Sequence, residues 1–98
     1  MTEETQVTPL QARVAEVAQY EANIALYTTI LETLPTEWPE NLLQYRGAKN
    51  QHDIIAGVES VDVELLSKLW YADECRKAIK TETLELTKSR AVLNVLQA

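Results

Sequence analysis

Residues 8–35 read TPLQARVAEVAQYEANIALYTTILETLP. Apolar and aromatic side chains, with one arginine among them, recur here at alternating spacings of three and four residues: Leu10, Arg13, Val17, Tyr20, Ile24, Tyr27, Leu31 and Leu34. A repeat of this kind forms one continuous strip on a helix, and such a strip is buried when another helix lies along it. The stretch therefore predicts a long helix that packs lengthwise against a second helix.

The sequence also predicts where this helix begins and ends. Thr8 can cap the first turn, Pro9 fits the first helical position, and Gln11 completes a capping box. Pro35 lacks a backbone donor and disfavours helical backbone in the residue before it. We expect the first long helix at about residues 9–33.

A second long helix is expected at about residues 60–97, because Ser60 or Asp62 can cap it and neither glycine nor proline follows. Its inner strip is predicted to contain Leu65, Leu69, Ala72, Cys75 or Arg76, Ile79, Thr83, Leu86, Arg90 and Leu93. A second apolar line, lying off that strip, contains Leu66, Trp70, Leu84, Ala91 and Val95. This helix is thus expected to be apolar on more than one side.

Shorter elements are predicted between the two long helices. Residues 40–46 carry apolar side chains at helical spacing and stop at Gly47, the preferred residue for a left-handed cap. A further short helix can begin after Asn50, although residues 53–58 are equally compatible with an extended segment. The fold class is accordingly all-α: an antiparallel helical hairpin with one or two short helices between its long arms. Residues 1–7 are expected to be a flexible tail and residues 8–98 a single domain.

The unequal lengths of the predicted arms point to assembly. The last helix exceeds the first by about 17 Å at 1.5 Å per residue. The short middle helices can cover part of the excess, but the second apolar line would remain exposed, and contiguous exposed apolar surface usually marks an interface. We therefore expect a homo-oligomer built as a helical bundle.

Composition limits the class of protein. The chain has 98 residues and a formal net charge of −6, and its first 64 residues are acidic whereas the remainder is slightly basic. Nucleic acid is a disfavoured partner because it requires clustered lysine and arginine, and no apolar run is long enough to suggest a membrane span. The polar, acidic start does not resemble a signal peptide, so a cytoplasmic location is expected.

Catalytic and metal-ligating residues are scarce. His52 and Cys75 are the only histidine and cysteine, and none of the usual zinc-ligand spacings occurs. Cys75 falls within the long helix, where a small apolar filler is its ordinary role. We expect no enzyme, no metal and no cofactor.

Two groups of residues are candidates for ligand binding. Arg13, Tyr20 and Tyr27 form a column along the first helix that could hold an acidic or aromatic ligand, or that could simply fill the seam. The loop from Tyr45 to His52 could receive an anionic group beside Arg76, Lys77 and Lys80, or could be a solvated connector.

Trp70 could anchor a partner or could cover the end of the core. Together the candidate partner- or ligand-binding residues are Tyr20, Tyr27, Tyr45, Arg46, Lys49, His52, Trp70, Arg76 and Lys80.

The leading functional hypothesis is a non-enzymatic interaction protein, an adaptor or inhibitor that assembles with itself through the long helix and binds a protein partner. The alternative is an oligomeric binder that sequesters a small anionic ligand such as a nucleotide. Small acidic helical proteins of this kind include virus-encoded antagonists of host defence, which is an analogy of class alone.

Overall fold

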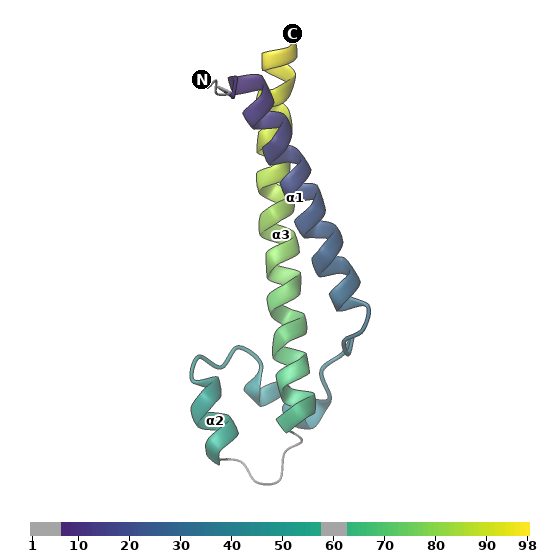
Figure 1. Cartoon of the computed structure of the whole chain (residues 1–98). Coiled ribbons are helices and arrows are strands. Elements are labelled where there is room, and N and C mark those ends of the chain that lie inside the picture. The colour runs from purple at the N-terminus through teal and green to yellow at the C-terminus, as the bar shows by residue number, and fades with distance from the viewer. Residues whose placement is uncertain (1–6, 58–62) are drawn as a thin grey trace, which may run out of the picture.

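The computed structural model describes residues 7–57 and 63–98. It contains α1 (Pro9–Leu31), the 3-10 helix η1 (Glu40–Tyr45), α2 (Gln51–Gly57) and α3 (Val63–Gln97). The two long helices, α1 and α3, pack antiparallel, and the short helices lie at the end of the hairpin opposite the chain termini (Figure 1). The predicted all-α helical hairpin is confirmed. The open question about residues 53–58 is answered by helix α2 as far as Gly57, and Val58 lies outside the described residues.

The start of α1 matches the sequence prediction. The Thr8 hydroxyl accepts a hydrogen bond from the Gln11 backbone N–H at 3.1 Å, and the Gln11 side chain accepts one from the Thr8 N–H at 3.0 Å. These two bonds form the expected capping box. The predicted caps of α3, Ser60 and Asp62, lie outside the described residues.

The end of α1 comes two residues earlier than predicted, at Leu31. The Thr33 and Leu34 N–H groups donate to carbonyls three residues back, at 3.0 and 3.1 Å, so the chain tightens before Pro35. This tightening is physically expected, because the residue before a proline is driven out of helical backbone geometry.

The strip of α3 along the hairpin differs in part from the predicted one. Thr83 and Arg90, which were placed inside, are exposed. Buried or half-buried side chains instead recur at Ala72, Cys75, Ile79, Glu82, Leu86, Ser89 and Leu93. The physical reason is that α1 supplies polar partners for the two unexpected members: Asn23 donates to the Glu82 carboxylate at 2.5 Å, and Ser89 donates to Glu16 at 2.6 Å.

The hydrophobic core lies at one end of the molecule. It contains Trp38, Leu42, Leu66, Leu69 and Trp70, with Tyr45, Ala48, Ile54 and Leu65 packed against it. The middle segment thus covers the first half of α3, including the part of the second apolar line formed by Leu66 and Trp70. We call residues 32–57 with 63–76 the head, and residues 9–31 with 77–97 the stalk.

The molecule is elongated because the stalk is only two helices thick. Its dimensions are 61 × 31 × 23 Å, and its radius of gyration is 19.6 Å, against about 13 Å for a compact domain of this length. Val17 is the one buried residue of α1. Leu84 and Val95, from the second apolar line, are 56% and 74% exposed. None of the described helices is long and apolar enough to cross a membrane.

Candidate functional site

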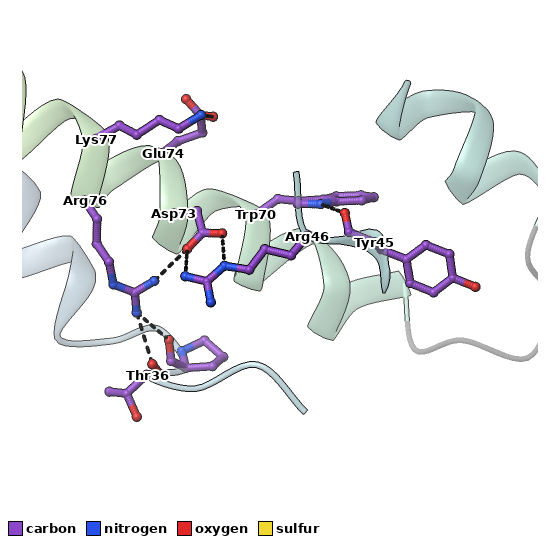
Figure 2. A network of polar contacts seen from close by, with 9 residues as sticks. Thr36, Tyr45, Arg46, Trp70, Asp73, Glu74, Arg76 and Lys77 are labelled. Carbon is purple, nitrogen blue, oxygen red and sulfur yellow. Dashed lines mark hydrogen bonds and ion pairs between the residues drawn. The ribbon is translucent and has the colours of Figure 1, made fainter. Parts of the chain in front are cut away.

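The main polar cluster of the molecule is centred on Asp73, on the first half of α3. Arg46, which follows η1, donates to both oxygens of this carboxylate, through Nε and a terminal nitrogen, each at 2.9 Å. Arg76, one turn along α3, donates to one of the same oxygens at 2.9 Å. Figure 2 shows the two guanidinium groups converging on Asp73 from opposite sides. One carboxylate therefore joins the middle segment to α3.

The same cluster also holds the chain entering the head. A second nitrogen of Arg76 donates to the Thr36 carbonyl at 3.3 Å and more distantly to the Pro35 carbonyl at 3.5 Å. Trp70 donates its indole N–H to the Tyr45 carbonyl at 3.0 Å. Backbone carbonyls before η1 and at its last residue thus accept hydrogen bonds from side chains of α3 (Figure 2).

The electrostatics of Asp73 reflect this pairing. Partial burial acts to raise the pKa of its carboxyl, but hydrogen bonding and charge from Arg46, with the charge of Arg76, lower the pKa below the ordinary value of 3.8. The indole of Trp38 contributes in the same direction. Its buried Nε1 makes no hydrogen bond of ordinary geometry, so we interpret this as a longer polar contact. Arg46 also lies over the Trp38 ring, 5.5 Å from its centre.

An open hollow of about 560 Å³ adjoins this cluster. Its charged lining consists of four cationic side chains, Arg46, Lys49, Arg76 and Lys77, and two carboxylates, Asp73 and Glu74. Gly47, Ala48, Gln51 and Trp70 complete the lining. The loop after η1 forms one wall and α3 the other, because the Asp73 cluster holds these two elements together.

The four cationic side chains differ in the ion pairs that they form. Arg46 and Arg76 share Asp73, as described above. Lys77 lies 3.6 Å from Glu74, and both of these side chains are more than half exposed. Lys49 is exposed and makes no ion pair with any other residue that the structure describes. The guanidinium groups of both arginines are held by Asp73. The two lysines have no buried partner, and an exposed ion pair such as that of Lys77 contributes little stability, so their ammonium groups can bind a ligand.

The structure brings together only part of the predicted set. Four of the nine candidate residues line the hollow: Arg46, Lys49, Trp70 and Arg76. His52 is exposed on α2 and Lys80 is exposed on α3, and neither lines the hollow. Tyr45 packs against the head core through its ring and meets the cluster only through its carbonyl.

The predicted column on α1 is not a single site. Arg13 is bound to Glu16 at 3.0 Å and to Ser89 at 3.3 Å, so its guanidinium serves the contact between the helices. Desolvation raises the pKa of Tyr20, and neighbouring carboxylates raise it further. Tyr27 lines a separate hollow of about 400 Å³ beside Lys77.

The carboxylates of the site were absent from the predicted set. Asp73 was overlooked because a lone aspartate within a long helix resembles any other solvated position. Its spacing of three residues from Arg76 was an available signal. Asp73 also pairs with Arg46, which lies 27 residues away in the sequence. This contact forms only when the segment before α3 folds back against that helix, so the residues around Asp73 do not predict it.

No group of three or more histidine, cysteine, aspartate or glutamate side chains is placed to hold a metal ion within residues 7–57 and 63–98. Cys75 is 1% exposed, as befits the apolar filler that the sequence predicted. The site is a charged recess whose two walls are joined by the hydrogen bonds of Asp73 with Arg46 and Arg76.

Comparison with protein-family models, with curated proteins and with solved structures finds no match.

Proposed function

We propose that this chain is a non-enzymatic helical interaction protein, an adaptor or inhibitor, which assembles with itself through the stalk. The observation that carries this proposal is the uncharged outer face of α1. In the assembled form the head remains accessible to a protein partner, to which it offers the exposed side chains of Leu43 and Tyr71.

The outer face is the side of α1 turned away from the seam. At 100° per residue it contains Gln11, Val14, Ala15, Ala18, Ala22, Ala25, Leu26 and Thr29, all of which are exposed. No member carries a charge, and Val14 and Leu26 are 47% and 57% exposed. A helix face that meets only water ordinarily carries charged side chains. This face has the composition of one that packs against another helix.

The accessible surface supports the same proposal. The chain exposes 7028 Å², whereas a compact monomer of 11.1 kDa exposes about 5,700 Å². The excess is about 1,300 Å², and a stable interface buries about 800 Å² on each partner. Pairing of two stalks would therefore bring the exposed area of each chain close to that of an ordinary folded domain.

The experiment is mass measurement by light scattering during size-exclusion chromatography. The native chain is expected at a multiple of 11.1 kDa. Ala22→Glu introduces a charge at the centre of the outer face with little change in helix propensity, and it should reduce the mass to that of one chain.

Ala56→Glu is the matched control, because it makes the same change at an exposed position of α2 in the head. It should leave the mass of the assembly unchanged. A native chain that elutes as a monomer at high concentration, or an Ala22→Glu variant that keeps its full mass, would refute self-assembly through this face.

A further inference from the structure

The hollow beside Asp73 concentrates positive charge in an acidic protein. Its lining has four cationic side chains against two carboxylates, an excess of two positive charges in a chain whose net charge is −6. Asp73 balances one of the two arginine charges and Glu74 balances one of the two lysine charges, so one unbalanced positive charge remains on the Arg46–Asp73–Arg76 cluster and one on the pair of lysines. Lys49 comes from the loop after η1 and Lys77 from α3, so the two lysines reach the hollow from different walls.

The chemistry of the lining suits a particular class of anion. Lysine ammonium groups act as point charges and are common partners of phosphate, whereas arginine is favoured where a planar fork meets a carboxylate. A phosphate monoester carries about two negative charges at neutral pH, which matches the local excess. Ala48 and Trp70 also line the hollow, although Trp70 is 6% exposed and packs mainly into the head core, so it borders a ligand only at its edge.

The size of the hollow supports a small molecule as the occupant. A volume of about 560 Å³ falls within the range of about 300–1,000 Å³ that is usual for small-ligand sites. An extended nucleic acid would meet the negative charge of the remaining surface, which opposes binding along a backbone. The positive charge of the recess does not continue as a stripe along α3, because Glu82 and Glu85 follow the basic residues that end at Lys80.

We propose that this hollow is a binding site for a small molecule bearing a phosphate monoester. Lys49 and Lys77 hold the phosphate, Arg46 and Arg76 are positioning residues that keep the two walls together through Asp73, and Trp70 borders the body of the ligand. The proposal does not depend on self-assembly, because every residue that it uses belongs to one chain.

Phenyl phosphate is a suitable probe, since it combines the phosphate with a small apolar body. Binding is followed in ¹⁵N-labelled protein through the indole N–H signals of the two tryptophans, assigned through the neighbouring backbone. Trp70 borders the hollow and Trp38 does not. Saturable movement of the Trp70 signal, with little change at Trp38, is the expected result.

The variants separate this site from general attraction between charges. Lys49→Gln with Lys77→Gln should weaken binding at least about tenfold, the effect of losing about one charge-assisted contact. Lys68→Gln with Lys88→Gln is the control: it removes the same charge from exposed positions of α3 outside the hollow. That variant should bind like the native chain. Circular dichroism verifies that both variants keep their helix content.

Three results would overturn the proposal. The first is a Trp70 signal that does not move saturably up to about 10 mM probe, because weaker binding would not be specific. The second is equal affinity in the Lys49→Gln, Lys77→Gln variant. The third is equal binding of benzoate or sulfate at matched ionic strength, which would exclude phosphate as the recognised group. Light scattering of the same samples measures the mass of the assembly independently, so failure of phosphate binding can be distinguished from failure of self-assembly.

Discussion

Asp73 is the single residue through which Arg46, in the segment between the two long helices, is held to α3. Its side chain is 19% exposed, and two guanidinium groups supply three hydrogen bonds to it. The fork of Arg46 fits the carboxylate with two parallel bonds, a geometry that lysine cannot reproduce. Because a partly buried charge is expensive when unpaired, removal of either partner should cost more than an ordinary surface ion pair.

The first prediction at this scale is that Asp73→Asn destabilises the protein by about 1–3 kcal/mol at pH 7, because charge-assisted hydrogen bonds to two arginines are weakened. Since the folded pKa of Asp73 lies below its unfolded value, the native chain holds this advantage above the unfolded pKa and loses it as the pH falls through the folded pKa. Urea unfolding between pH 7 and pH 2.5 measures the difference.

Glu74→Gln is the control for this measurement. Glu74 neighbours Asp73, but its ion pair with Lys77 is long at 3.6 Å and its side chain is 62% exposed. Exposed pairs contribute about 0–1 kcal/mol, so this variant should be nearly as stable as the native chain. A difference between native protein and Asp73→Asn that stays constant through pH 3 would show that the Asp73 charge does not stabilise the fold.

At the scale of elements, the contact between α1 and α3 is a heptad strip with polar layers. Ser89 is 2% exposed and both accepts from Arg13 and donates to Glu16. The Asn23–Glu82 hydrogen bond forms a second layer further along the hairpin. Apolar contacts in such a seam tolerate sliding by one heptad, whereas these polar pairs are satisfied in a single alignment. We interpret the layers as the features that set the register of the two helices.

The prediction that follows is that Ser89→Ala lowers the unfolding free energy by about 1–2 kcal/mol, because Glu16 and Arg13 lose a buried partner. In a double-mutant cycle with Glu16→Gln, the two losses should be less than additive, since both changes remove the same hydrogen bond. Ser67→Ala, at an exposed position of α3, should change stability by less than about 0.5 kcal/mol. Strictly additive losses would mean that Ser89 and Glu16 act independently.

Local sequence signals predicted the elements of this fold well. The Thr8–Gln11 capping box and the break at Pro35 place α1 to within two residues, because caps and prolines act through neighbouring backbone. The interior strip of α3 was predicted less well. Heptad spacing placed Thr83 and Arg90 inside. Ser89 and Glu82 are inside because α1 provides their partners, and a partner on another helix leaves no trace in local spacing.

The candidate site was predictable to a similar extent. The sequence identified the loop containing Arg46 and Lys49 as the basic spot within the acidic part of the chain, and it named Arg76 on the facing helix. It also included His52 and Lys80, because spacing along the chain does not say which side of an element faces a recess. Asp73 became evident only from the contact between segments.

The whole molecule combines a packed head with an under-packed stalk. The head holds nearly all of the large buried side chains, whereas a two-helix stalk leaves at least half of each helix in water. A pair of helices of this length seldom persists on its own, because most helical stability in proteins comes from burying an apolar face. Self-association with a second copy would therefore stabilise the stalk by burying apolar surface that two helices alone leave exposed.

The last prediction concerns the thermal stability of the assembly. If folding and self-association are coupled, a tenfold increase in protein concentration stabilises the native state by about 1.4 kcal/mol for a dimer. For two chains of this size the Tm should then rise by about 3–5 °C for each tenfold increase. Ala22→Glu should lower the Tm and abolish this dependence, whereas Ala56→Glu should keep it. Calorimetry over a hundredfold concentration range makes the measurement. A native Tm that is independent of concentration, with unfolding reversible, would mean that the stalk is stable as two helices alone.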